Sequence, residues 1–275
     1  MIDKEKLKRR FSRNAKHYSK YASVQKKMGD MLVKKLVDEH LCFKRILEIG
    51  CGTGYVTQAL AEHFPAAAIT AVDIAPGMIE HIKSTLQYDN VEFICGDIEE
   101  MTLNGKYDLI ISNATFQWFN HLDKTLAKLA KLLDKNGVLC FSTFGQNTFI
   151  ELYEAFEKAK ELLNISEAVS PGQSFYSLNA LQDICKNIVT DNHLDNMEIF
   201  STECYEYEYF DGCTDFLYSI KKIGANNSQS SGSNMIHGFI EKVIELYDRD
   251  FMVSYKEKDK VRATYHNIFV YMKFT

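Results

Sequence analysis

The stretch ILEIGCGTGYVTQAL, residues 46–60, sets three glycines between an apolar run and a helical pattern. The apolar run predicts a buried strand over 45–49, and the spacing of the apolar residues that follow predicts a helix over 55–63. A backbone without Cβ atoms can turn sharply and can approach a ligand closely. We therefore expect the loop over 50–54 to lie directly against a ligand.

Alternating strand and helix patterns extend outward from this loop. Strand-like runs and helical patterns follow one another at 68–73, 78–86, 91–95, 107–112, 122–133 and 138–143. This alternation is typical of βαβ units, which place parallel strands side by side and cover both faces of a sheet with helices. We therefore predict a Rossmann-like α/β fold with a doubly wound, mostly parallel, seven-stranded sheet. In such a sheet, ligands bind at the carboxyl ends of the strands.

The second half of the chain does not continue this alternation of strands and helices. The patterns are, in order, helix 148–163, helix 177–187, strand 198–210, a helix to 223, polar loop 224–234, helix 235–250 and strand 262–274. The last two strands predict an antiparallel edge, and the helical segment between them predicts a lid. We expect a basic helical arm over 1–40, a binding core over 41–148, and the remainder of the same domain over 149–275.

Composition narrows the class of protein. Of the 275 residues, 46% are apolar and 25% are charged, and no apolar run is long enough to cross a bilayer. No signal-peptide pattern follows Met1, so we expect a cytoplasmic protein with no membrane partner. The seven cysteines are odd in number and scattered, without a C-x-x-C pair. This pattern argues against disulfides and against a zinc site, and we predict no metal.

The charge is unevenly distributed. Residues 1–35 carry twelve Lys and Arg against three acids, a net charge of +9, which leaves −14 for the rest of a chain whose total is −5. A basic arm on an acidic body favours an anionic partner or substrate. A solvated helical face explains the same charges equally well.

Acidic residues follow the glycines at the ends of the predicted strands. Glu48 precedes the loop, Asp73 closes the second strand, and Asp97 follows the third. A carboxylate at Asp73 can accept both hydroxyls of a ribose, and one at Asp97 can face an exocyclic amine. Glu48 would repel a pyrophosphate but would suit a cationic amino-acid group. The pattern therefore indicates a positively charged nucleoside ligand without phosphates.

The segments LEIGCGTG, VDIAPGMI, GDIE and DLIISNATFQW, all within residues 46–143, resemble the class I S-adenosylmethionine-dependent methyltransferases. The resemblance implies S-adenosyl-L-methionine as the cofactor. It implies that this cofactor contacts Glu48, Gly50, Gly52 and Gly54 on its methionine and ribose side, Asp73 and Ile74 at the ribose, Met78, Asp97 and Ile98 around the adenine, and Asn113 at the pocket floor. For Met78, an ordinary core position is an equally good interpretation.

The methyl acceptor can be narrowed by chemistry. Nucleobase amino methylation usually relies on a D/N-P-P-Y/F segment where this chain has SNAT, and catechol methylation needs a metal held by clustered carboxylates. A carboxylate acceptor is already ionised at neutral pH, so it needs a cationic or hydrogen-bonding partner and no general base. Lys221, Tyr265 and His266 are candidates for that partner. Lys221 as a solvated helix residue and His266 as a core residue remain open alternatives.

Further segments extend the resemblance almost end to end. The chain is similar to the malonyl-[acyl-carrier protein] O-methyltransferases of biotin synthesis in FSRNAKHYSKYASVQKKM, NATFQWFN, LLDKNGVLCFSTFG, SIKKIGAN and TYH. That family methylates the free carboxylate of a malonyl thioester. The resemblance implies catalytic roles for Tyr18, Lys221, Tyr265 and His266, closure over the cofactor by Tyr18 and Tyr21, and an acceptor pocket shaped by Phe116 and Trp118.

The same resemblance implies a partner. Acyl carrier protein is strongly acidic, so the basic arm would steer its docking, and we expect no nucleic-acid partner. The polar loop over 224–234 departs from the family pattern, and Tyr18 could equally be a packing residue. Other carboxyl or quinone methyltransferases, RNA methylation through the basic arm, and a non-enzymatic sensor of S-adenosylmethionine stay open as alternatives.

Overall fold

A single mixed sheet forms the centre of the computed structural model, which describes residues 1–165, 170–194, 196–224 and 235–274. Within these residues the sheet has eight strands, seven of them in the order β3-β2-β1-β4-β5-β8-β6. The parallel part consists of β1 (Arg45–Ile49), β2 (Ala68–Asp73), β3 (Val91–Cys95), β4 (Tyr107–Asn113) and β5 (Leu133–Phe144). The prediction of a doubly wound, mostly parallel sheet is confirmed.

Two long antiparallel strands complete the path, as expected. Strand β8 (Lys258–Phe274) pairs with β5, and β6 (Met197–Phe210) pairs with β8 at the outer edge. The eighth strand, β7 (Met252–Tyr255), forms a hairpin with the start of β8. The sequence did not predict β7, because four residues are too few to show a period of two.

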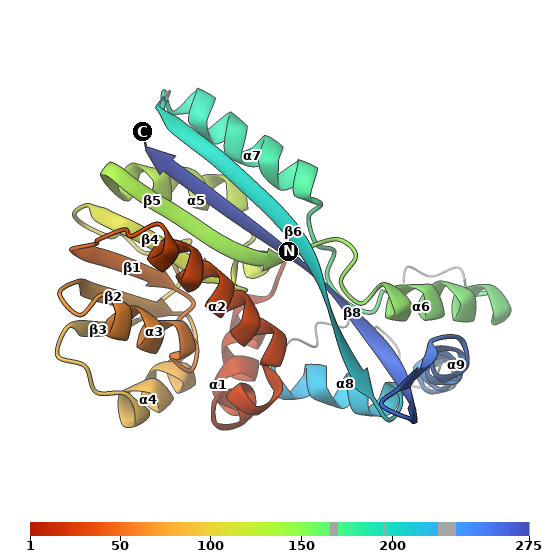
Figure 1. Cartoon of the computed structure of the whole chain (residues 1–275). Coiled ribbons are helices and arrows are strands. Elements are labelled where there is room, and N and C mark those ends of the chain that lie inside the picture. The colour runs from red at the N-terminus through yellow and green to blue at the C-terminus, as the bar shows by residue number, and fades with distance from the viewer. Residues whose placement is uncertain (166–169, 195, 225–234, 275) are drawn as a thin grey trace.

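Helices cover both faces of the sheet (Figure 1). One face packs against α2 (Ser23–Asp38), α3 (Tyr55–His63) and α4 (Pro76–Thr85). The other packs against α5 (Leu122–Leu132) and α7 (Leu178–Asp191). Both faces are buried because successive strand residues alternate between them: Ile46 joins the first layer and Leu47 the second.

The basic arm consists of two helices with different environments. Helix α2 buries Met28, Leu32 and Leu36 against the sheet and is therefore part of the core. Helix α1 (Lys4–Tyr21) buries little of its own surface and lies against α4 and α8 (Cys213–Lys222). Helix α1 is thus placed as a cover over the carboxyl ends of the strands.

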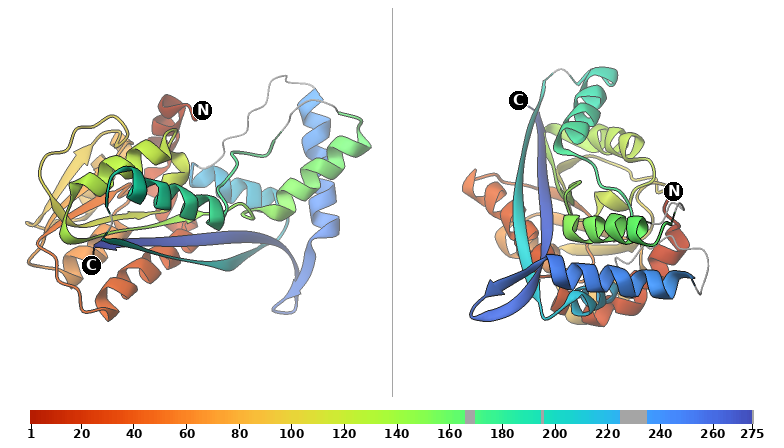
Figure 2. Two further views of the ribbon diagram at one scale, coloured as in Figure 1. Left: turned by 90° about the horizontal axis from the view of Figure 1, so that it is seen from above. Right: turned by 90° about the vertical axis from the view of Figure 1, so that its right-hand side faces the viewer.

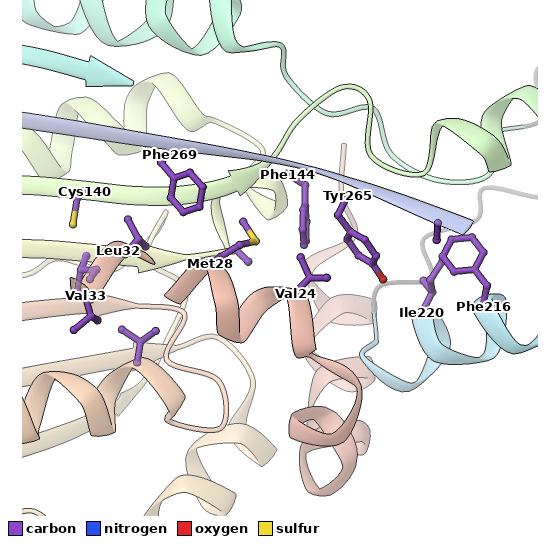
Figure 3. Packing of buried hydrophobic residues seen from close by; sticks show 14 of the residues in the cluster. Val24, Met28, Leu32, Val33, Cys140, Phe144, Phe216, Ile220, Tyr265 and Phe269 are labelled. Atoms are coloured by element: carbon purple, nitrogen blue, oxygen red, sulfur yellow. The ribbon is translucent and has the colours of Figure 1, made fainter. Parts of the chain in front are cut away.

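The C-terminal helices form a second layer beside the core. Strands β6 and β8 extend beyond the parallel strands and carry α6 (Ile150–Leu162), α8 and α9 (Met235–Asp250) at their far end (Figure 2). Figure 3 shows one apolar cluster running from Met28 and Val24 on α2, past Phe144 and Tyr265, to Phe216 on α8. Most of the predicted polar loop, 225–234, lies outside the described residues.

Candidate active site

The glycine loop after β1 has the backbone that the sequence predicts. Gly50 and Gly52 have φ values of +73° and +53°, a region that favours glycine. A Cβ on Gly50 would collide with Thr115, whereas a Cβ on Gly52 would meet nothing within 4 Å. Gly52 therefore faces open space. Gly54, in contrast, packs against Ile82 of α4 and against Leu86, which follows that helix, and it caps the start of α3.

A cavity of about 640 Å³ opens at the carboxyl ends of β1 to β4; we call it the loop cavity. Most of the residues predicted to bind the cofactor line it. They are Tyr18, Gly50, Gly52, Asp73, Ile74, Met78, Asp97, Ile98 and Asn113, together with Trp118. A smaller space of about 420 Å³, the side pocket, shares Tyr18, the two glycines and Asn113, and adds Gln25, Lys26 and Glu48.

Both carboxylate oxygens of Asp73 are held by backbone amides, one from the glycine loop and one from the turn after β2. Its Oδ2 accepts a hydrogen bond from the Gly52 amide at 2.9 Å, and its Oδ1 accepts one from the Ala75 amide at 2.8 Å. Burial raises the pKa of Asp73 to about 6, although the two amide hydrogen bonds act in the opposite direction. The carboxyl group is therefore fixed in place at the cavity wall.

Glu48 is the most buried acid of the site, with 2% of its surface exposed. Burial raises its pKa to about 7, and a 2.6 Å hydrogen bond from the Thr57 hydroxyl opposes that shift. Its side-chain partner among the described residues is this neutral hydroxyl, so the carboxyl group can still pair with a cation in the side pocket.

Helix α1 closes the loop cavity from above. Tyr18 and Phe11 line it, and the Phe11 ring packs edge-on against Trp118 at a centroid distance of 5.6 Å. Burial, with a smaller effect of Asp73, raises the pKa of Tyr18, which keeps it a neutral phenol. Tyr21, the second predicted closing residue, instead packs against Tyr218 of α8 and is not part of the cavity lining.

At the Asp97 side of the loop cavity, an ion-pair network joins α1 to the loop after β3. The Nζ atom of Lys4 lies 2.5 Å from Glu99 and 3.5 Å from Asp97. Asn120 accepts a hydrogen bond from the Ile2 amide at 2.7 Å and donates one to its carbonyl at 3.0 Å. Sequence reasoning did not identify Lys4, because a lysine within a basic run carries no distinguishing signal.

A second space, the apolar cavity of about 1120 Å³, lies between β8, α6, α8 and α9. Its wall is formed mainly by aliphatic and aromatic residues, with Lys221 and Tyr265 among the polar ones. Trp118 lines both this cavity and the loop cavity, so the two spaces meet at its ring. Lys222 points elsewhere, with its Nζ 4.9 Å from the centre of the Tyr218 ring.

His266 does not lie with Tyr265 at the apolar cavity. Successive side chains of β8 point to opposite faces of the sheet, so Tyr265 faces α2 and α8 whereas His266 faces away from them. The His266 ring stacks on Tyr205 at 4.8 Å, and its Nε2 atom lies 2.8 Å from the Glu203 carboxylate. This geometry corrects the expectation that both residues face one substrate.

Phe116 is also placed differently from the expectation. It begins the short 3₁₀ helix η1 (Phe116–Trp118), but its ring is buried against Phe141 at 4.5 Å and Phe119 at 4.8 Å. It lines neither cavity and supports Phe119, which does line the loop cavity. Residues of a tight turn point in different directions, so Trp118 reaches both cavities whereas Phe116 does not.

Gln25 was missed by sequence reasoning. It is buried on the sheet-facing side of α2 and lines both the side pocket and the apolar cavity. The signal that could have revealed it is a polar residue within the apolar stripe of a helix, beside Val24 and Met28.

Two features are absent from the described part of the chain. It contains no cluster of three or more His, Cys, Asp or Glu side chains that could hold a metal ion. It also has no helix with the length and apolar character needed to span a bilayer.

Comparison with solved structures identifies the fold. The YcgJ protein of Bacillus subtilis superposes with a TM-score of 0.58 at 16% identity, covering 88% of this chain and 97% of that one. The plantazolicin methyltransferase BpumL, solved in complex with SAH and a desmethylPZN analogue, superposes with a TM-score of 0.53 at 14% identity, covering 99% and 98%. The fold is thus that of the class I methyltransferases.

Comparison of sequences identifies the family. A family model described as a methyltransferase domain matches residues 43–206. The malonyl-[acyl-carrier protein] O-methyltransferase of Acetivibrio thermocellus is 47% identical over 98% of this chain and 94% of its own. The enzyme of the same name from Priestia megaterium is 45% identical over 97% and 96%. The chain belongs to the malonyl-[acyl-carrier protein] O-methyltransferase family.

Proposed function

We propose that the protein transfers a methyl group from S-adenosylmethionine to the free carboxylate of malonyl-acyl carrier protein, in the cytoplasm, as an early step of biotin synthesis. The observation that carries the proposal is the meeting of two unlike spaces at Trp118. One is lined by acids and bare backbone, and the other is apolar with a lysine at its wall. This arrangement suits a cationic donor on one side and an anionic acceptor on the other.

The residues of the loop cavity and the side pocket fit the donor. Glu48 can pair with the ammonium group, and the fixed carboxylate of Asp73 can accept the ribose hydroxyls. Met78 and Ile98 can pack on the adenine, and Gly52 leaves space for the ligand. When bound, S-adenosylmethionine supplies an electrophilic methyl group on a sulfonium sulfur.

The acceptor requires positioning and no proton transfer. A malonyl carboxylate is ionised at neutral pH, so the protein need not supply a general base. Lys221 would neutralise it at the apolar cavity, where an unpaired anion would cost several kcal/mol. Tyr18 would close the donor side and exclude water. Such positioning can lower the activation free energy by about 7–11 kcal/mol.

The proposed carrier partner fits the outer surface of α1. Arg9, Arg13 and Lys16 are exposed at helical spacing on one stripe of this helix, which we call the α1 stripe. Within the described residues, none of the three has an ion-pair partner. An acidic carrier protein docking there would lie next to the helix that covers the site, and the attraction would speed its association.

The test is methyl transfer from labelled S-adenosylmethionine to malonyl-acyl carrier protein by the pure protein. We expect a base-labile methyl ester. Lys221→Ala should lower kcat/KM for the malonyl thioester at least tenfold with little change in S-adenosylmethionine affinity, because Lys221 lines only the acceptor side. Lys222→Ala is the matched control and should retain activity, since its Nζ lies over the Tyr218 ring.

Two results would count against the proposal. Absence of methyl transfer to both malonyl-acyl carrier protein and malonyl-CoA would refute it. A loss of S-adenosylmethionine binding in Lys221→Ala as large as the loss of turnover would show that Lys221 belongs to the donor site.

A further inference from the structure

The side chain of Gln25 is a carboxamide at the wall of two cavities, without a hydrogen-bond partner among the described residues. Only 7% of the residue is exposed, yet within the described structure its side chain makes no hydrogen bond. Its backbone is fixed, because the carbonyl accepts a 2.8 Å hydrogen bond from the Asn113 side chain. Because the residue lines two cavities, its amide is open to a molecule bound there.

The position of Gln25 shows where that molecule would lie. The residue lines the side pocket, which leads to the glycine loop, and also the apolar cavity. Trp118 is likewise shared between the apolar cavity and the loop cavity. The carboxamide therefore faces the region where donor and acceptor would meet.

Three other polar groups of the apolar cavity are already engaged. The Tyr265 hydroxyl donates to Glu208 at 2.7 Å, and the Tyr153 hydroxyl donates to the Gln173 carbonyl at 2.8 Å. The Gln173 Nε2 atom donates to the Gln117 carbonyl at 3.0 Å, and its buried Oε1 atom, which has no partner in the described structure, is an acceptor that cannot bind a carboxylate. In contrast, both N–H groups of the Gln25 carboxamide are available to a ligand.

We propose that Gln25 binds the acceptor carboxylate, donating a hydrogen bond from Nε2 to one carboxylate oxygen while Lys221 supplies the positive charge. This inference rests on the proposed function and adds a substrate-binding residue to it. The donor's own carboxylate is a weaker candidate for the Gln25 amide, because the side pocket offers it the ammonium group of Lys26. In the apolar cavity, by contrast, the three engaged groups already donate hydrogen bonds within the protein.

The reaction chemistry specifies which kinetic constant should change. The acceptor carboxylate loses negative charge as the ester forms, so a hydrogen bond to it is no stronger in the transition state than in the bound substrate. An interaction of this kind contributes to substrate binding and hardly to the chemical step. Removal of the Gln25 amide should therefore raise KM and leave kcat nearly unchanged.

The experiment uses Gln25→Leu, which keeps similar side-chain volume and removes the amide. We expect the KM for malonyl-acyl carrier protein to rise about tenfold or more, since hydrogen bonds to charged groups are among the stronger ones. The affinity for S-adenosylmethionine, measured by calorimetry, should stay within about twofold. The thermal unfolding midpoint should change little, because the Gln25 amide makes no hydrogen bond within the described structure.

Gln182→Leu is the matched control. Gln182 lies on α7, on the opposite face of the sheet, and its amide donates a 2.8 Å hydrogen bond to the Ser201 hydroxyl of β6. It should lower stability slightly and leave KM unchanged. An unchanged KM in Gln25→Leu, or a tenfold loss of S-adenosylmethionine affinity instead, would overturn the inference while wild-type turnover upholds the proposed function. No turnover by the wild type would refute the proposed function and, with it, this assignment.

Discussion

Glu48 and Asp73 are deeply buried carboxyl groups at the walls of the side pocket and the loop cavity. Burial raises their pKa values to about 7 and about 6, so between pH 4 and pH 7 the folded chain holds more protons at these groups than the unfolded chain does. The free energy of unfolding of the unliganded protein should therefore fall as pH rises through this window. A cationic ligand has the opposite effect, because its charge favours the ionised carboxylates.

This coupling predicts a pH-dependent affinity for S-adenosylmethionine. With a Glu48 pKa of about 7, the ionised fraction rises about tenfold between pH 6 and pH 8, and the affinity should rise by a similar factor. Calorimetry in buffers of different ionisation enthalpy should detect proton release on binding. Glu48→Gln should bind more weakly at pH 8 and show a flatter profile. A wild-type affinity independent of pH would contradict the assignment of Glu48.

The sequence could place the candidate site residues at strand ends, but it could not identify Gln25 or the direction in which His266 points. Asp73 and Asp97 could be placed from the sequence because parallel strands end at one edge of the sheet, which brings their last residues together. Gln25 could not, because its role depends on which groups around it lack partners. His266 was misplaced because a sequence shows that strand residues alternate, but shows only weakly which face each of them meets.

At the scale of elements, the position of α1 decides whether the loop cavity is covered. The Gly77 amide donates to the Ser12 hydroxyl at 3.2 Å, where α1 crosses the start of α4. A Cβ on Gly77 would lie only 2.7 Å from the Ser12 Cα atom and carbonyl oxygen. Because backbone atoms cannot move aside independently, a larger residue at Gly77 would displace the whole helix.

Gly77→Ala should therefore weaken cofactor binding without touching the cofactor site. We expect the packing of α1 over the loop cavity to be destabilised by about 1–3 kcal/mol, with a corresponding fall in S-adenosylmethionine affinity. Trp118 is the single tryptophan of the chain and lies between the cavities, so its fluorescence can report the titration. Gly238→Ala on α9 is the control, since a Cβ there meets nothing within 4 Å. Equal affinities for the wild type and Gly77→Ala would show that α1 does not cover bound cofactor.

The same scale shows what local patterns could establish about the fold. The bounds of β1, β2 and β3 agree with the predicted runs, because each is a short buried strand with clear turn residues on both sides. The insertion of β8 between β5 and β6 was not predictable, since that pairing joins residues far apart in the chain. The sequence indicated an antiparallel edge without indicating the order of its strands.

Across the whole molecule, the net charge of +9 in residues 1–35 separates into two parts. Lysines on α2 are used within the protein: Lys27 pairs with Glu206, Lys34 with Asp38, and Lys35 with Glu39. The α1 stripe has no such partners in the described structure. The charge left for an external partner is therefore concentrated on the helix that covers the loop cavity.

This separation predicts that the α1 stripe acts on the carrier protein and not on the methyl transfer. Reversal of all three charges, Arg9→Glu, Arg13→Glu and Lys16→Glu, should raise KM for malonyl-acyl carrier protein about tenfold or more and flatten its dependence on salt. Turnover of malonyl-pantetheine, which has no acidic protein attached, should stay the same. The matched control reverses Lys34 and Lys35, whose charges are paired within α2. Because the stripe is proposed to contact only the carrier, an equal loss of activity on both substrates would show that the variant disturbs the cover itself and would refute docking at α1.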